Sequence, residues 1–354
     1  MGRDDRPSLS RARCDEKERS LCGPLRVATS TVPGRRLMTL SSTPNNPAPP
    51  GGIEEDISAA DGVRLRTARW TPSSAIGTVV VLGGRGEFIE KYFEVISELL
   101  ARSFAVATMD WRGQGGSDRP LRDARKGHVD DFVQFECDLD ALVEKILARE
   151  CPRPWFGLCH SMGAAVLLGA SEGGRCPFER LVLTSPMIAV KGVNHRGATS
   201  FLVAALDSLG MGGAFTPGAA GDSLWLSPFE GNVFTSDEGR FARIARLVAA
   251  TPELRLGGPT IRWTRAAFRH MRRLDDSKFT PGTLTPMLIV AAGADRVTDT
   301  AATERFALRL GEARIVVIDG AQHEILIERD VLRAQFWTAF DRFVPGSSSK
   351  PCQP

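Results

Sequence analysis

The residues best suited to chemistry begin with a serine at the start of a helix-forming run. Residues 157–163, GLCHSMG, place Ser161 between a short apolar run and the sequence AAVLL. This pattern matches a G-x-S-x-G turn between strand and helix, which exposes a nucleophilic serine. Cys159 stands where that motif has its first glycine, and we expect it to be a small packed hydrophobe rather than a second nucleophile. Taken alone, the run also fits a junction where Ser161 only caps the helix.

A serine nucleophile needs an imidazole base that is held by a carboxylate. Asp295 comes just after the apolar run 287–291, and His323 comes just after the run 314–318. Parallel strands carry their ligand-binding groups at their carboxyl ends, so these side chains should meet Ser161 at one edge of a sheet. We predict Ser161 as nucleophile, His323 as base and Asp295 as the orienting acid, with acyl transfer as the chemistry.

Other acids and histidines are weaker candidates. Asp299 lies further into the next helical pattern, and Asp319 is too close in sequence to His323 to reach round its ring. His195 and His270 fall in an irregular part of the chain, where a surface or packing role is the expected one.

Acyl transfer also needs hydrogen-bond donors for the developing oxyanion. The backbone amide of Met162, which follows the serine, is the first predicted donor. The second is the amide of Arg85, in the glycine-rich run LGGRGE at residues 82–87. A phosphate-binding loop is excluded there, because no GK[ST] ending follows and the G-x-G-x-x-G spacing is missing. Three residues of this turn are predicted to contact substrate: Gly84, Gly86 and Glu87.

The elements that must position these residues alternate between strand-like and helical patterns from residue 63 to 184 and again from residue 287. This rhythm is typical of an α/β fold with a parallel sheet. It breaks between residues 186 and 281, where glycine-rich pieces alternate with helical patterns such as 238–250 and 260–273. We predict a disordered extension (1–55), a first core part (56–185), an inserted helical cap (186–281), a second core part (282–345) and a disordered tail (346–354).

The composition of the chain limits the kinds of binding partner that we expect. Hydrophobic residues make up 42% of the 354 residues, and the net charge of +3 arises from mixed basic and acidic residues, which gives no reason to expect nucleic acid. The seven cysteines lack the short paired spacing of a zinc site, so we expect no metal, reduced thiols and a cytoplasmic protein. No run reaches the ~20 apolar residues of a spanning helix. Peripheral contact of the cap with the inner membrane face stays compatible with the sequence.

With these residues identified, the chain resembles the lysophospholipase L2 and monoacylglycerol lipase branch of the α/β-hydrolases, of serine aminopeptidase S33 type, over residues 60–343. The resemblance rests on the runs GRGEFIEKY (84–92), DWRGQGGS (110–117), GHVDDF (127–132), the serine turn and GAQHEIL (320–326). It implies a mostly parallel eight-stranded sheet flanked by helices, with a helical cap inserted after the sixth strand. Two residues depart from the family pattern. Cys159 replaces the first glycine of the serine turn, and Gly83 stands where lipase relatives often carry a histidine.

The resemblance also implies a reaction. We expect a serine carboxylic-ester hydrolase for single-chain glycerolipids, a lysophospholipase that works through an acyl-Ser161 intermediate without a cofactor or an obligate protein partner. A monoacylglycerol lipase, a general carboxylesterase and an aminopeptidase use the same machinery, and an inactive hydrolase-fold binding protein is the alternative from another class. A set of arginines in the cap is a candidate for binding a phosphate, although a solvated helix face explains it equally: Arg240, Arg243, Arg246 and Arg255.

Overall fold

The computed structural model describes residues 39–347 except 173–175, 195, 220, 281–284 and 312. The described residues form one eight-stranded sheet in the order β1-β2-β4-β3-β5-β6-β7-β8. Strand β2 runs antiparallel to both of its neighbours, and all other pairs are parallel. The strands are β1 (Ile53–Ser58), β2 (Arg64–Trp70), β3 (Thr78–Leu82), β4 (Ala105–Met109), β5 (Trp155–His160), β6 (Arg180–Thr184), β7 (Met287–Ala292) and β8 (Ala313–Ile318).

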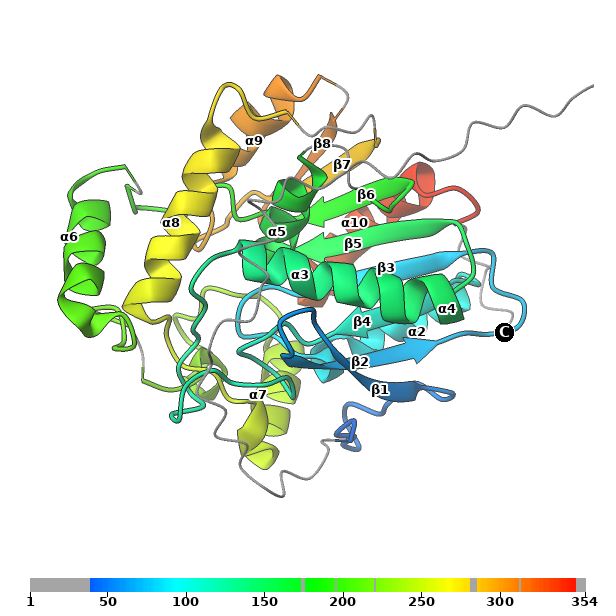
Figure 1. The fold of residues 1–354 in the computed structure, drawn as a ribbon. Coiled ribbons are helices and arrows are strands. Elements are labelled where there is room, and N and C mark those ends of the chain that lie inside the picture. The colour runs from blue at the N-terminus through cyan, green and yellow to red at the C-terminus, as the bar shows by residue number, and fades with distance from the viewer. Residues whose placement is uncertain are drawn as a thin grey trace, which may run out of the picture.

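Helices cover both faces of this sheet. They are α2 (Phe93–Ala101), α3 (Val133–Leu142), α4 (Ala148–Glu150), α5 (Ser161–Ser171), α6 (Ala198–Leu206), α7 (Glu238–Ala250), α8 (Ile261–Asp275), α9 (Thr300–Arg309) and α10 (Asp330–Phe343). Shorter turns are η1 (Ile89–Tyr92), η2 (Val143–Leu147), η3 (Asp207–Met211), η4 (Leu224–Leu226), η5 (Pro252–Leu254) and η6 (Ile325–Ile327). In Figure 1, α3 and α5 lie in front of the sheet and α10 lies behind it. The predicted α/β-hydrolase fold is confirmed.

The central strands β3 and β5 are buried along their whole length because both of their faces are covered. In β3, Val80 and Leu82 pack with the helices α3 and α5, whereas Val79 and Val81 pack with α2 and α10 on the opposite face. Alternate side chains of one strand therefore belong to two different cores. This burial fixes the register of the sheet and with it the edge at which the parallel strands end.

The predicted N-terminal boundary is wrong. Residues 53–55 were expected to be disordered, yet they belong to β1, which pairs with β2. The chain before β1 also makes specific contacts: Trp70 Nε1 donates to the Pro49 carbonyl at 2.9 Å, and the Asn46 amide donates to the Glu90 carbonyl at 2.9 Å. β1 is largely polar because it is an edge strand, so no apolar run marks it. The remainder of the predicted extension, residues 1–38, and residues 348–354 of the predicted tail lie outside the described residues.

The chain between β6 and β7, residues 185–286, is called here the β6–β7 segment. It carries α6, α7 and α8, and the helical patterns at 238–250 and 260–273 are confirmed as α7 and α8. Figure 1 shows α8 beside the sheet and α6 beyond it at the outer edge of the molecule. Apolar residues of α8, such as Phe268 and Met271, join the same core as α3 and α5. The β6–β7 segment is therefore packed onto the sheet domain through α8.

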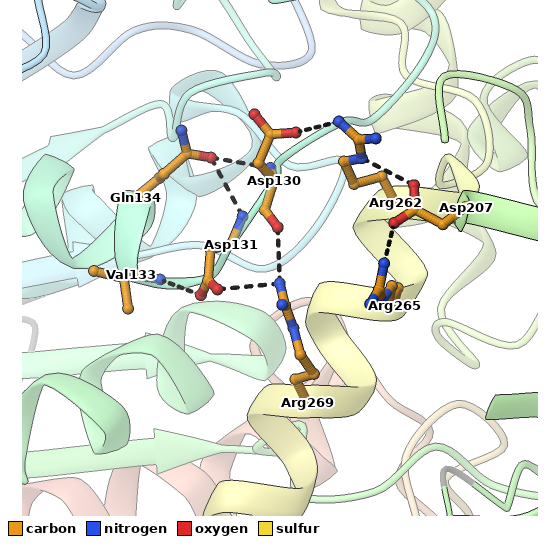
Figure 2. Close-up of a pocket in the computed structure, with 8 residues that line it drawn as sticks. All are labelled: Asp130, Asp131, Val133, Gln134, Asp207, Arg262, Arg265 and Arg269. Atoms are coloured by element: carbon orange, nitrogen blue, oxygen red, sulfur yellow. Dashed lines mark hydrogen bonds and ion pairs between the residues drawn. The ribbon is translucent and has the colours of Figure 1, made fainter. Parts of the chain in front are cut away.

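Arginines of α8 form ion pairs with acidic residues that precede α3. Arg262 pairs with Asp130 at 3.1 Å and with Asp207 at 2.9 Å, and Arg269 pairs with Asp131 at 3.0 Å. Figure 2 shows these side chains lining a surface pocket between α8 and the start of α3. Asp131 also accepts the Val133 amide at 3.2 Å at the start of α3. Asp131 thus has the structural role expected of an acidic residue before a helix, whereas the Asp130 carboxylate pairs with Arg262 of α8.

Candidate active site

The turn between β5 and α5 places Ser161 at the carboxyl edge of the sheet. β5 ends at His160, and α5 begins at Ser161 with a positive φ of 49°. A serine in this conformation is strained, as expected for a nucleophile turn. A side chain on Gly163 would place its Cβ 2.5 Å from the Gly83 carbonyl oxygen, so only glycine lets α5 approach β3 this closely.

The structure brings the three predicted catalytic side chains into contact. His323 Nε2 lies 3.0 Å from Ser161 Oγ, and His323 Nδ1 lies 2.9 Å from Asp295 Oδ2. Ser161 is 7% exposed, His323 4% and Asp295 1%, so the contacts are shielded from competing water. With Nδ1 donating to the carboxylate, Nε2 is left as an acceptor for the serine hydroxyl. This arrangement can activate the hydroxyl for attack on a carbonyl.

Asp295 is held by more than the histidine. Its Oδ1 accepts the amides of Val297 at 2.7 Å and Thr298 at 2.9 Å, and its Oδ2 accepts the Thr298 hydroxyl at 2.8 Å. Burial alone would raise the pKa of Asp295, but the hydrogen bond and charge of His323 and the local donors outweigh it and hold this pKa below its usual value. The carboxylate is therefore ionised and its orientation is fixed.

Asp299 and Asp319, the weaker candidates for the orienting acid, make other contacts. Asp299 caps α9 by accepting the Ala302 amide at 3.0 Å, and Asp319 packs against Gly293.

The sequence analysis did not predict one contact at this site: the Ser185 hydroxyl donates to the His323 carbonyl at 2.8 Å. The signal for it was a serine directly after β6, at the same edge of the sheet as Ser161.

The glycine-rich turn after β3 lies against the serine. A Cβ on Gly84 would be 3.0 Å from Ser161 Cβ. The Gly84 amide donates to Glu87 Oε2 at 2.6 Å, and the Gly86 amide donates to Gln114 Oε1 at 3.1 Å. Between them, the amide of Arg85 donates to no group among the described residues. It is thus the one amide of residues 84–86 left available to a ligand.

The other predicted donor, the Met162 amide, directly follows the serine in the chain. Met162 is in the first turn of α5, whose amides have no acceptor within the helix. The amides of Arg85 and Met162 come from two elements that meet at Ser161. Their catalytic role remains a proposal.

A group of ionisable residues is buried beneath this turn; we call Glu87, Lys91, Tyr92, His160 and Glu324 the buried charge cluster. Lys91 Nζ lies 2.5 Å from Glu324 Oε2 and 3.0 Å from Glu87 Oε1. The Tyr92 hydroxyl donates to Glu87. His160 Nε2 lies 3.2 Å from Glu324 Oε2, and the His160 ring is 4.8 Å from the ring of His323. The cluster therefore joins the turn after β3 to His160, which precedes Ser161, and to Glu324, which follows His323.

The charges of the cluster stabilise one another. Burial alone would lower the pKa of Lys91 and of His160, but Glu324 and Glu87 outweigh it and raise both values. Burial alone would raise the pKa of Glu324, and Lys91 and His160 reverse that shift to well below the usual value. These shifts favour the charged forms of Lys91, His160 and Glu324.

The same residues have the ligand types of a metal site. One ligand atom each from Glu87, His160 and Glu324 lies within 4.8 Å of the others. However, the ammonium of Lys91 already lies between the two carboxylates and supplies the positive charge that a cation would bring. We interpret the cluster as an internal salt bridge and not as a metal site. The Glu87 carboxylate faces this cluster and the Gly84 amide, and its predicted contact with substrate stays a prediction.

Cys159, the departure from the motif, lies in β5 with no exposed surface. Burial raises the pKa of its thiol well above the usual value, so it stays protonated and packs as a small hydrophobe. Cys151 and Cys176 are also free.

Comparisons with known proteins show which family and which relatives this chain is similar to. The family described as Serine aminopeptidase, S33 matches residues 73–330. Lysophospholipase L2 of Escherichia coli (strain K12) is 32% identical over 300 residues, which cover 79% of this chain and 84% of that protein. The probable lysophospholipase L2 of Haemophilus influenzae is 28% identical over 274 residues, 77% of this chain and 85% of that protein.

A solved structure of similar fold is that of a soluble variant of monoglyceride lipase from Saccharomyces cerevisiae, in complex with a substrate analog. It superposes with a TM-score of 0.63 at 18% identity and covers 82% of this chain and 95% of that chain. This likeness supports the fold alone.

Proposed function

This chain belongs to the serine aminopeptidase S33 family of α/β-hydrolases, and from that premise we propose that it is a lysophospholipase. The observation that carries the proposal is the contact of His323 with Ser161 at 3.0 Å and with Asp295 at 2.9 Å. These contacts support hydrolysis through an acyl-enzyme. The substrate class comes from the names of the relatives, since the same three residues serve many leaving groups.

The reaction follows from the roles of these residues. Ser161 attacks the ester carbonyl while His323 takes its proton, and the proton then passes to the departing glycerol oxygen. Asp295 keeps the imidazole oriented and stabilises its protonated form. The amides of Arg85 and Met162 bind the oxyanion, and loss of one such donor typically lowers turnover ~100- to 1000-fold. Water, activated by His323, then releases the fatty acid from Ser161.

The β6–β7 segment offers a surface for the lipid phase. No helix in the described part of the chain has the length and apolar character to cross a bilayer. Phe201 in α6 and Leu209 in η3 are 78% and 77% exposed, and Leu202 is 52% exposed. Neighbouring exposed apolar side chains of this size favour interfacial binding. We include in the proposal a peripheral contact of this segment with the membrane that contains the substrate.

The proposal is tested on a substrate panel. Wild-type protein and Ser161→Ala are assayed with 1-palmitoyl-lysophosphatidylethanolamine, 1-monopalmitoylglycerol and an alanine anilide. We expect wild-type protein to release palmitate from the lysophospholipid and Ser161→Ala to lose at least about a thousandfold in turnover. Preferential cleavage of the anilide would assign an aminopeptidase instead. Failure of wild-type protein on all three substrates would favour a binding protein.

A further inference from the structure

Arg85 carries a guanidinium without a counter-ion at the edge of the candidate site. Its Nη2 donates to the Gly257 carbonyl at 2.6 Å, and its Cζ lies 5.2 Å from the centre of the Trp263 ring. Its Nε is buried and has no partner among the described residues. None of the described carboxylates forms an ion pair with it, so the positive charge faces only a carbonyl and an aromatic ring.

The arginines first predicted to bind phosphate are placed differently. Arg240 pairs with Glu94 at 2.6 Å and with Asp237 at 2.8 Å, and Arg243 contacts the Glu94 carboxylate, so each of these arginines has a carboxylate partner within the protein. Arg255 donates to the Val248 carbonyl at 3.3 Å, and Arg246 is exposed to solvent. Arg85 is therefore a better candidate for binding a phosphate than these four arginines.

The surroundings of Arg85 are built to hold a guanidinium. A Cβ on Gly127 would lie 2.5 Å from Arg85 Nη2, so the absence of a side chain at residue 127 makes room for it. Burial lowers the pKa of Arg85 to about 10, which still leaves it charged at neutral pH. A partly desolvated cation is unfavourable until an anion joins it. A guanidinium is well suited to a phosphate, because its planar N–H groups form paired hydrogen bonds with phosphate oxygens.

The position of Arg85 relative to the proposed chemistry suits a lysophospholipid. Its backbone amide is the proposed donor to the ester oxygen, and its side chain extends toward Gly257 and Trp263 of the β6–β7 segment. In a lysophospholipid, the glycerol separates the ester carbonyl carbon from phosphorus by as many bonds as separate the arginine Cα from its terminal nitrogens. One residue can therefore serve both ends of the reacting head group.

We propose that the Arg85 side chain binds the phosphodiester of the substrate and makes the enzyme prefer lysophospholipids to monoacylglycerols. This inference rests on the proposed function and assigns the specificity of that site to one residue. The guanidinium donates to the phosphate oxygens, and its contacts with Gly257 and Trp263 hold it in place.

The test measures a ratio within each variant. For wild type, Arg85→Met and Arg85→Lys, kcat/KM is determined on 1-palmitoyl-lysophosphatidylethanolamine and on 1-monopalmitoylglycerol, which differ only in the phosphoethanolamine group. We expect Arg85→Met to lower the ratio of the two values about 10- to 100-fold, the loss typical of hydrogen bonds to a charged group. Arg85→Lys should retain part of the preference. Because both substrates meet the same protein, effects on folding or on the oxyanion donor cancel.

Arg243→Met is the matched control, because Arg243 is paired with Glu94, and it should leave the ratio within about twofold of wild type. An unchanged ratio in Arg85→Met would overturn the inference while leaving the proposed function intact. If wild-type protein cleaves neither lipid, it is the proposed function that fails. An equal fall of the ratio in Arg243→Met would overturn the assignment to Arg85.

Discussion

At the scale of single residues, the buried charge cluster explains how three separate stretches of chain stay aligned at the site. Glu87 holds the Gly84 amide at 2.6 Å and Lys91 Nζ at 3.0 Å, while Lys91 also binds Glu324, the neighbour of His323. His160, which precedes Ser161, completes the cluster. Glu87, His160 and Glu324 are far apart in the sequence, so the cluster ties the proposed oxyanion turn to the serine and the histidine.

Lys91→Met should strongly destabilise the protein. Lys91 is 1% exposed, and its removal leaves the carboxylates of Glu87 and Glu324 buried without their ammonium. Removing one partner of a buried ion pair typically costs about 3–5 kcal/mol. Urea unfolding monitored by circular dichroism measures this change in the free energy of unfolding.

The control is Arg196→Met. Arg196 pairs with Asp275 at 2.9 Å, but their side chains are 53% and 49% exposed, and such a surface pair is worth about 0–1 kcal/mol. If Lys91→Met cost no more than this control, the cluster would not stabilise the fold as described.

At the scale of elements, helix α5 depends on close packing against α8. His270 of α8 donates from Nε2 to the Ala165 carbonyl at 2.8 Å and stacks on Phe132 at 4.8 Å. A Cβ on Gly169 would lie 2.4 Å from His270 Cε1, so the ring fills the space that glycine leaves. The packing role expected for His270 is confirmed, whereas His195 lies outside the described residues.

This contact predicts a pH dependence of stability. Burial lowers the pKa of His270 to about 4, whereas the unfolded chain binds a proton near the usual 6.5. Acid therefore favours the unfolded state: the stability from neutral His270 is present above about pH 6.5 and is lost as pH falls toward 4. Between pH 7 and pH 5, we expect wild type to lose about 2 kcal/mol more than His270→Gln, which keeps a donor but does not titrate.

Urea unfolding of both proteins at the two pH values measures this difference, and all other titrating groups are common to both. Parallel losses in wild type and His270→Gln would show that His270 is not held neutral by the packing of α8 on α5.

At the scale of the whole molecule, six of the eleven large apolar side chains that are exposed in the described residues lie in the β6–β7 segment. Figure 1 places α6 at the outer edge of the molecule, away from the sheet. If this surface contacts lipid, Phe201→Glu and Leu209→Glu should each lower binding to vesicles of phosphatidylethanolamine and phosphatidylglycerol about tenfold, since each removes a large apolar side chain from the interface. Co-sedimentation with the vesicles measures this binding.

Leu308→Glu in α9 is the control, because Leu308 is 78% exposed, as Phe201 is, and lies outside the β6–β7 segment. Equal losses in all three variants would indicate nonspecific charge repulsion. No loss in Phe201→Glu and Leu209→Glu would contradict the proposed membrane contact.

The sheet and the three candidate catalytic residues could be predicted from the sequence, because each of these residues follows shortly after the end of an apolar strand. The apolar strands β3, β5 and β7 and the residues Ser161 and His323 just past strand ends were visible as local patterns. The polar edge strand β1 left no such pattern. The burial of Glu87 and the pairing of Arg240 with Glu94 depend on contacts distant in sequence, which no local pattern shows. The division into a core and a cap stays a prediction.

The central claim is that Ser161 is a nucleophile activated by His323 and Asp295. The most direct measurement is labelling of the intact protein with a fluorophosphonate, followed by peptide mass spectrometry to locate the adduct. We predict a single adduct on Ser161 in wild type, much slower labelling in His323→Ala and none in Ser161→Ala. An adduct on another residue, or equal labelling of Ser161→Ala and wild type, would contradict the account.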